Sequence, residues 1–176
     1  WEVAKADIER FFDSSDKRIF SFSELGAILR AQSTTWQLAP SLTQSRFIGF
    51  LLQQSRLQEL QLKSEGIGDA TRYAWGTPSP FALGLSLRKG GYLCHGSAVF
   101  LHGLTQDLPK TIYINVEQSP KGSFGASMTQ ESIDLAFSRP PRTSRHVLRW
   151  GKLAFVVVNG KFTGRLEVGR LLGPDG

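Results

Sequence analysis

The sequence predicts a mixed α/β fold of the α+β type, in which a helical first half precedes a smaller, sheet-forming half. Three observations indicate this division. Apolar residues recur at helical spacing in three segments before residue 56. Residues 57–75 read as a β-hairpin, and the runs 111–116 and 153–158 are rich in β-branched residues that favour strands. Of the 176 residues, 40% are hydrophobic and 20% charged, which is typical of a globular chain with a buried core.

Three amphipathic helices are expected in the first half, over residues 3–12, 24–32 and 43–55. In each of them apolar residues return every three to four positions, so that one face of the helix can be buried. A short strand or extended segment at 18–22 separates the first two helices. Ser23 is the expected N-cap of the second helix, because a serine hydroxyl can accept a hydrogen bond from the first turn.

A β-hairpin is expected after the third helix, with strands over residues 57–63 and 71–75. Helix, strand, helix, helix and hairpin follow one another in the order of a winged helix-turn-helix. Residues 75–80 contain two prolines and a glycine, and this stiff segment is the expected domain boundary. We therefore divide the chain into a winged helix-turn-helix over 1–80 and a small α/β domain over 81–176, which we expect to be truncated.

The second half begins with the stretch from Gly91 to Val116. It reads as a strand-like segment at 92–93, a short apolar helix over 97–102 that Gly103 ends, and a strand over 111–116.

Beyond this stretch the pattern is less regular. Residues 118–127 read as a loop, and residues 133–137 fit a strand because apolar residues alternate there. A strong hairpin is expected where Asn159 and Gly160 follow the strand at 153–158. This dipeptide readily supplies the positive φ angles of a type I′ turn.

The net charge of +6 is unevenly placed along the chain. Residues 1–80 contain nine basic and nine acidic residues, whereas residues 81–176 contain twelve and six. A basic balance is compatible with nucleic-acid binding. The single cysteine excludes an internal disulfide framework and favours the reducing cytoplasm. No apolar run approaches the roughly 20 residues that span a bilayer, so no membrane association is expected.

The third helix contains the strongest candidates for DNA recognition. In a winged helix this element lies in the major groove, where glutamine can pair with adenine and arginine with guanine. Gly49 would permit close approach, and the hairpin would supply the wing contacts. The candidate DNA-binding residues are Thr43, Gln44, Arg46, Gly49, Gln53, Arg56, Lys63 and Arg72. The alternative is that these are solvated polar residues of a helical domain that binds a protein.

A second basic segment covers residues 139–152, which contain five basic residues and no acidic one. Cations at this density can hold a phosphate backbone without reading sequence. The alternative is a solvated basic loop. The basic residues are Arg139, Arg142, Arg145, Arg149 and Lys152.

Metal and catalytic chemistry are not expected. Cys94, His95 and His102 do not have the spacing of a zinc site, and His102 is better interpreted as the end of a helix. Ser97 lies near both histidines but not in a nucleophile elbow, and no carboxylate is placed to orient either histidine. We therefore expect neither a metal, nor a cofactor, nor an enzyme.

The segment GYLCHGSAVFLHGLTQDLPKTIYIN resembles the central signature of the AbiEi family, the antitoxins of type IV toxin–antitoxin systems in bacterial phage defence. The matching positions are Tyr92, Ser97, Ala98, His102, Gly103, Leu104, Pro109, Ile112 and Tyr113. The resemblance implies an N-terminal winged helix-turn-helix and a C-terminal antitoxin domain. It further implies a transcriptional autorepressor that binds operator DNA and counteracts a cognate toxin, without necessarily holding that toxin in a stable complex.

Two other functions remain open from the sequence. The winged helix could serve as a protein-interaction module, with the basic segment binding an acidic partner. The chain could also be the DNA-binding part of a larger phage-defence or restriction assembly.

Overall fold

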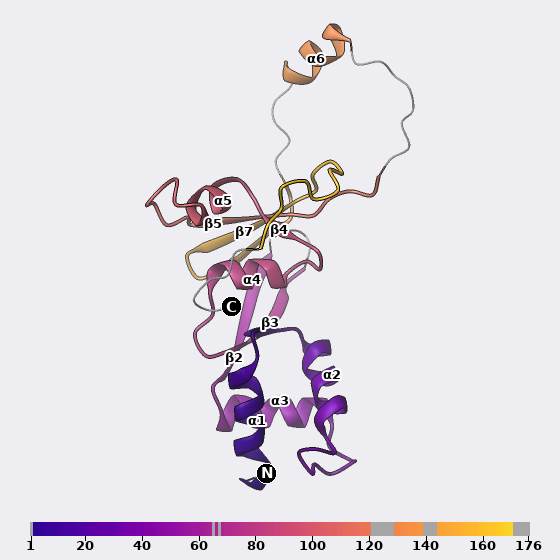
Figure 1. Ribbon diagram of the computed structural model, residues 1–176, viewed down its shortest axis with the longest axis vertical. Coiled ribbons are helices and arrows are strands. Elements are labelled where there is room, and N and C mark those ends of the chain that lie inside the picture. Colours follow the sequence, from indigo (N-terminus) through magenta and orange to yellow (C-terminus); the bar gives the residue numbers. More distant parts are fainter. Residues whose placement is uncertain (1, 65, 67, 121–128, 139–143, 171–176) are drawn as a thin grey trace.

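The computed structural model describes residues 2–64, 66, 68–120, 129–138 and 144–170, and it confirms a mixed α/β fold (Figure 1). The helices are α1 (Glu2–Ser14), α2 (Phe22–Gln32), α3 (Gln44–Gln54), α4 (Pro80–Ser86), α5 (His95–Leu101) and α6 (Gln130–Phe137). The strands are β1 (Ile19–Phe20), β2 (Leu57–Ser64), β3 (Ala70–Trp75), β4 (Tyr92–Leu93), β5 (Thr111–Asn115), β6 (Val147–Trp150) and β7 (Leu153–Val158).

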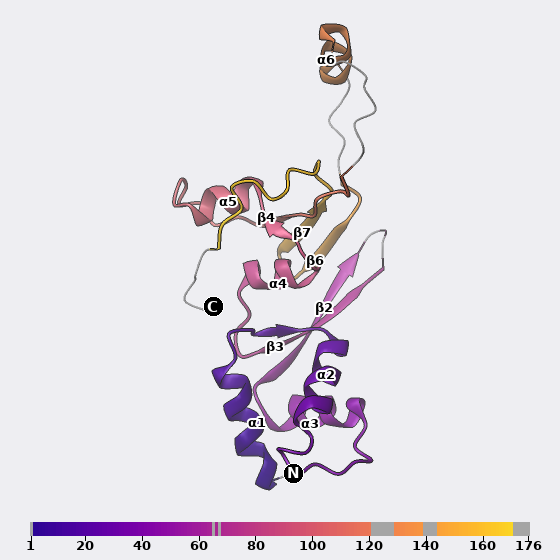
Figure 2. The ribbon, with the colours of Figure 1, turned by 45° about the vertical axis from the view of Figure 1, so that its right-hand side comes forward.

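The strands form a sheet in the order β1-β3-β2-β6-β7-β5-β4. All neighbours are antiparallel except β5 and β7, which are parallel. Strand β2 joins the two halves of the chain. It pairs with β3 from Leu57 to Leu62, and its end pairs with β6, where Lys63 lies opposite Arg149. Figure 2 shows the resulting elongated molecule, with α1, α2 and α3 at one end and the strands of the second half beyond the hairpin.

A first hydrophobic cluster fills the space between the three N-terminal helices and one face of the hairpin. Aromatic rings dominate it. Phe12 is fully buried and contacts Phe11, Phe20 and Trp75, while Trp36 stacks on Phe47. The three expected helices and the expected hairpin are confirmed. Trp36, in the connector between α2 and α3, is buried in this cluster.

A second cluster lies on the other face of the same three strands. Phe20, Tyr73 and Trp75 face the first cluster, whereas their neighbours Ile19 and Ala74 face the second. Side chains alternate between the faces of a strand, so β1, β3 and β2 form a layer that the two clusters share. This layer is buried on both faces at residues 19–20 and 73–75, whereas Glu59 and Gln61 of β2 are exposed. The second cluster continues through buried residues of α4 and its C-cap and of β5, β6 and β7, namely Leu83, Leu87, Ile112, Ile114, Leu148 and Phe155.

The start of α2 differs from the prediction. Ser21, not Ser23, is the N-cap, and its hydroxyl accepts a hydrogen bond from the backbone nitrogen of Glu24. The Glu24 carboxylate accepts one in return from the Ser21 backbone nitrogen at 2.7 Å. The helix therefore begins two residues earlier than expected, because this reciprocal capping box satisfies two backbone donors at once.

Residues 133–137 form part of helix α6, so the predicted strand there is wrong. Thr129 caps the helix by accepting from the Ser132 backbone nitrogen, and the side chain of Gln130 donates to Asp134 one turn later at 2.8 Å. A segment this short satisfies both alternating and helical spacing. The capping and the side-chain bond one turn apart favour the helix.

The predicted hairpin at Asn159 and Gly160 is also wrong. The turn lies instead at Gly151 and Lys152, between β6 and β7, where Gly151 adopts a positive φ of 56°. Gly160 serves a different purpose. Its backbone nitrogen donates to Oδ1 of Asn115 at 2.7 Å, and a Cβ at this position would lie 2.6 Å from that oxygen. Glycine is required there by close approach rather than by turn geometry.

The short helices α4 and α5 flank strand β4. Helix α4, which the sequence analysis does not anticipate, begins with Pro80 at its first position, where the missing N–H costs nothing. Helix α5 ends where expected: His102 is the C-cap, and Gly103 follows with a positive φ of 69°. Among the described residues, no helix has the length and apolar character needed to cross a bilayer.

Candidate nucleic-acid interface

Helix α3 is held by its inner face and by both of its ends. Phe47, Ile48 and Leu51 are buried in the first cluster. The Thr43 hydroxyl accepts a hydrogen bond from the Arg46 backbone nitrogen, so Thr43 acts as the N-cap. At the other end, the Ser55 hydroxyl donates to the Leu51 carbonyl at 2.6 Å. The buried inner face sets the orientation of the helix in the fold, and the two local hydrogen bonds set where the helix begins and ends.

Gln44 fastens α3 to α2 instead of facing outward. Its side-chain nitrogen donates to the Phe22 carbonyl at the start of α2. Its carboxamide occupies the space that a side chain at Gly26 would need, since a Cβ there would lie 2.2 Å from the Gln44 Oε1. The amide that was a candidate for pairing with adenine is therefore engaged within the protein.

The outer face of α3 presents Arg46, Gly49 and Gln53. These positions are three to four residues apart, which places them on one side of the helix. Arg46 and Gln53 are exposed, and no atom lies within 4 Å of the position of a Cβ on Gly49. Three of the eight predicted DNA-binding residues thus share an accessible surface, which we call the α3 outer face.

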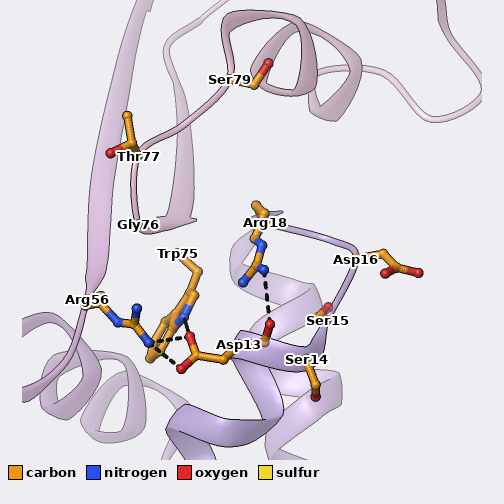
Figure 3. A pocket seen from close by; sticks show the side chains of 10 residues that line it. All are labelled: Asp13, Ser14, Ser15, Asp16, Arg18, Arg56, Trp75, Gly76, Thr77 and Ser79. Atoms are coloured by element: carbon orange, nitrogen blue, oxygen red, sulfur yellow. Dashed lines mark hydrogen bonds and ion pairs between the residues drawn. The ribbon is translucent and has the colours of Figure 1, made fainter. Parts of the chain in front are cut away.

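Arg56 belongs to a polar cluster at the end of α1 (Figure 3). Its guanidinium pairs with both oxygens of the Asp13 carboxylate and lies 5.6 Å from the ring centroid of Trp75. The Trp75 indole nitrogen donates to the same carboxylate at 2.7 Å. This hydrogen bond is the main cause of the lowered pKa of Asp13, to which Arg56 also contributes.

A cavity of about 590 Å³ opens beside this cluster, between residues 13–18 and residues 75–79. Arg18 lines it and donates to the carbonyls of Phe12 and Asp13, at 2.9 and 3.0 Å. Two arginines and two aspartates line the cavity. Arg56 is paired with Asp13, and Arg18 donates to backbone carbonyls. It is charge-balanced, so it does not favour an anion such as phosphate.

The two hairpin candidates lie away from α3. Lys63 forms an ion pair with Asp69 at 2.7 Å, next to the point where β2 joins β6. The hydrogen bond from Lys63 lowers the pKa of Asp69. Arg72 is half-buried and donates from Nε to the Ser86 carbonyl at 3.1 Å, and its burial lowers its own pKa. Arg72 therefore faces the second half of the chain.

The second basic segment is only partly a loop. Arg149 lies in β6, Arg145 precedes this strand and Lys152 occupies the β6–β7 turn, and all three are exposed. Arg139 and Arg142 lie outside the described residues. Figure 2 places β6 on the far side of the hairpin from α3, so the structure does not bring the two groups of basic residues together.

Three of the residues that carry the family resemblance, Tyr92, Ser97 and Tyr113, take part in a polar anchor around β5. Ser97 is fully buried, and its hydroxyl accepts a hydrogen bond from the Tyr113 backbone nitrogen at 2.9 Å. The buried Asn115 donates to the Tyr92 hydroxyl at 2.5 Å and accepts from Gly160. Ser97 thus satisfies an amide at the edge of β5, which is a structural role.

Cys94 and His95 lie side by side at the start of α5, with 3.0 Å between the sulfur and Nδ1. Burial raises the pKa of the Cys94 thiol to about 11, which disfavours the thiolate that metals and electrophiles require. His102 lies at the opposite end of the helix. The three side chains are therefore not arranged as one site.

The sequence reasoning overlooked two features of this region. The capping box at Ser21 was available in the sequence as a serine three residues before a glutamate. The second is local charge. No acidic residue occurs between Glu24 and Glu59, a stretch that contains Arg30, Arg46 and Arg56. The first half is neutral overall, but the chain around α3 is basic.

Comparisons of the chain with protein-family models, with curated proteins and with solved structures found no match.

Proposed function

We propose that the chain binds double-stranded DNA through α3 and reads sequence with the α3 outer face. The observation that carries this proposal is the accessible group of Arg46, Gly49 and Gln53 on a helix whose inner face and ends are fixed. Arginine can donate two hydrogen bonds to guanine, and a glycine lets the backbone approach the groove. A reading helix must be rigid, and the Gln44 bond to α2 contributes to that rigidity.

The order of elements supports a winged helix as the scaffold. Elements α1, β1, α2, α3, β2 and β3 follow one another, with β1 antiparallel to β3 at the edge of the hairpin. In helix-turn-helix proteins the second helix of the pair enters the major groove. We assign that position to α3. The acid-free stretch around it favours approach to phosphate.

The wing in this proposal differs from the one that the sequence suggested. Lys63 is paired with Asp69 and lies beside β6, and Arg72 donates to the backbone near α4. Arg56 is paired with Asp13. We therefore assign base recognition to Arg46 and Gln53 alone and give these three cations structural roles.

By its resemblance to the AbiEi family, we extend the proposal to a transcriptional autorepressor and antitoxin of a type IV toxin–antitoxin system. An autorepressor binds the promoter of its own gene. The test is fluorescence anisotropy with that promoter and an unrelated duplex of equal length, each at two salt concentrations. We expect tighter binding to the promoter at both concentrations.

Two outcomes would contradict the proposal. Equal binding to both duplexes that disappears at the higher salt concentration would indicate electrostatic binding without sequence reading. No binding to either duplex would favour a protein-interaction module.

A further inference from the structure

One end of the sheet in the second half is built from two segments without acidic residues. Positions 70–106 contain no aspartate or glutamate, and neither do positions 135–166. Strands β5 and β7 are parallel, and they end opposite each other at Asn115 and Val158. Strands β4 and β6 run antiparallel to them. The residues that precede β4, from the first segment, and those that precede β6, from the second, therefore lie at the same end of the sheet.

Three exposed cations lie at this end of the sheet. Arg88 Nη2 lies 3.4 Å from Nδ1 of His146, although the two residues are 58 positions apart. Lys89 follows Arg88 and Arg145 precedes His146, so this contact brings two further cations into the same region. Arg88, Lys89 and Arg145 are all exposed. We call these three residues the basic end.

The turn that carries Arg88 and Lys89 is held in place. The Gly91 backbone nitrogen donates to the Arg88 carbonyl at 3.1 Å, and Gly90 between them has a positive φ of 76°. A Cβ on Gly91 would lie 2.7 Å from the Ile114 side chain, so the turn lies directly against β5. The Arg165 guanidinium donates to the Gly90 carbonyl from the other side.

The backbone on both sides of Arg145 is held by β7. The Ser144 hydroxyl donates to the Val157 carbonyl at 2.5 Å and accepts from the His146 backbone nitrogen at 3.1 Å. The Val157 backbone nitrogen donates to the His146 carbonyl at 2.9 Å. The sheet therefore sets where the cations of the basic end are presented.

The positive charge of the basic end is not neutralised within the described part of the chain. The ion pairs between described residues involve none of its three members. His146 offers Arg88 a ring nitrogen rather than a carboxylate. Glu117 is a carboxylate at this end, two positions after β5, and it accepts from the Thr163 hydroxyl and the Arg165 backbone nitrogen. These bonds engage it with the chain that follows β7.

Arg72 adds positive charge behind the basic end. Its Nε donates to the Ser86 carbonyl, two positions before Arg88. Burial is the main cause of the lowered pKa of Arg72; Glu24 acts in the opposite direction, and the charge of Arg88 lowers the pKa further. Arg72 and Arg88 are therefore close enough to repel each other, and an anion bound beside them would relieve this repulsion.

The chemistry of this surface matches a chain of phosphates. Its cations are exposed and come from two segments, so they are spread over a surface rather than gathered around one small anion. Guanidinium groups form paired hydrogen bonds with phosphate oxygens, and an ammonium group attracts phosphate as a point charge. Double-stranded DNA carries about one negative charge per 1.7 Å of its axis, so it presents several phosphates to such a surface.

We infer that the basic end binds the phosphate backbone of double-stranded DNA without reading its sequence. This contact adds to the affinity for any duplex, whereas base recognition belongs to the α3 outer face. In the sequence, Arg145 groups with Lys152. In the fold, Lys152 lies at the opposite end of β7, and Arg145 lies in the region of Arg88 and Lys89. The inference does not depend on base reading by α3.

Lys89→Ala combined with Arg145→Ala tests the inference in the full 176-residue chain. Both side chains are exposed, and Arg88 is left in place. The matched control is Lys110→Ala with Lys152→Ala, which removes two exposed cations at the other end of β5 and β7. Fluorescence anisotropy would measure the affinity of each protein for an unrelated duplex over a series of salt concentrations.

Each phosphate contact contributes about 0.9 to the slope of log affinity against log salt concentration. We therefore expect the variant of Lys89 and Arg145 to bind several-fold more weakly at low salt, with a slope that is shallower by roughly 2. The control should keep most of the wild-type slope. Because the duplex is unrelated to the promoter, a failure of base reading by α3 would not change this result.

Equal slopes for the two double variants would overturn the inference. Polyglutamate that binds the wild type as tightly as the duplex does, and loses its affinity in the variant of Lys89 and Arg145, would overturn DNA as the partner. That result would indicate an acidic protein instead.

Discussion

The two halves of the molecule are held together by contacts of different range. In the first half, several aromatic partners are close in sequence, such as Phe12 with Phe20 and Trp36 with Phe47, although Phe12 also stacks on Trp75 of the hairpin. In the second half, the sheet joins strands that are far apart in the chain: β5 pairs with β7, and β6 reaches back to β2. We conclude that the local sequence pattern largely determines the secondary structure of the first half. The sheet of the second half also needs the hairpin in place, because β6 pairs with β2.

The hairpin is the element that both halves share, and large-to-small substitutions test this most strongly. Phe12→Ala in the first cluster and Phe155→Ala in the second should each lower the free energy of unfolding by about 3–5 kcal/mol, because both rings are fully buried. Since β1, β3 and β2 contribute to both clusters, we expect a single urea transition for each variant. Tryptophan fluorescence and circular dichroism should report the same midpoint.

A two-step urea transition would show that the strands shared by the two clusters do not couple the unfolding of the two halves. In that case Phe12→Ala would move one step and leave the other at its wild-type midpoint.

Ser97→Ala tests the polar anchor of the second half. The substitution leaves the Tyr113 backbone nitrogen without its partner next to a fully buried side chain. An unsatisfied buried donor costs about 1–3 kcal/mol, so thermal unfolding should occur at a clearly lower temperature. Ser45→Ala on the exposed side of α3 is the control. Equal effects of the two substitutions would show that the Ser97 hydrogen bond contributes nothing specific.

Ser21→Ala tests the local capping of the first half. Loss of an N-cap hydroxyl destabilises a protein by about 1 kcal/mol. Ser23→Ala removes the serine that the sequence favoured but that does not cap the helix, and its effect should be smaller. Chemical denaturation of the two variants, measured side by side, distinguishes the positions. A larger loss for Ser23→Ala would contradict the capping geometry.

Asp13→Asn gives the smallest expected effect and a defined pH dependence. The hydrogen bond from Trp75 lowers the folded-state pKa of Asp13 below its unfolded value. The stabilisation is therefore fully present above the ordinary aspartate pKa of about 3.9, and it is lost as pH falls through the lowered folded value. The variant should be less stable than wild type at pH 7, and the difference should shrink below about pH 4. Asp16→Asn is the neighbouring control, and a difference that stays constant down to pH 2 would contradict this role.

Much of the first half could be predicted because its signals are local. The apolar spacing of Phe47, Ile48 and Leu51 indicates the buried face of α3 directly. In the second half, the hairpin predicted at Asn159 and Gly160 was wrong. The backbone nitrogen of Gly160 donates a hydrogen bond to Asn115, a residue 45 positions away in the sequence. No local pattern contains that contact. In α6 the segment was too short for periodicity to separate a helix from a strand.

From the sequence, the polar residues of the candidate site could be identified, but not which of them are exposed and which bind other parts of the protein. Arg46, Gly49 and Gln53 lie on the α3 outer face as helical spacing requires. Gln44 and Arg56 lie on the same segment but bind Phe22 and Asp13, because α2 and α1 pack against it. Such tertiary neighbours decide which polar side chains form hydrogen bonds or ion pairs within the protein. The sequence pattern identifies the polar side chain but not its partner in the fold.

The most direct test of the proposed function compares two arginines, one from each half. Arg46→Ala and Arg145→Ala each remove one exposed cation. Anisotropy titrations would measure the affinity of each variant for the promoter and for an unrelated duplex. If Arg46 reads a base, its loss should weaken promoter binding by about 1–3 kcal/mol, roughly 5- to 150-fold, and change the unrelated duplex far less. Arg145→Ala should leave the ratio of the two affinities unchanged. An unchanged ratio for Arg46→Ala would contradict sequence reading by α3.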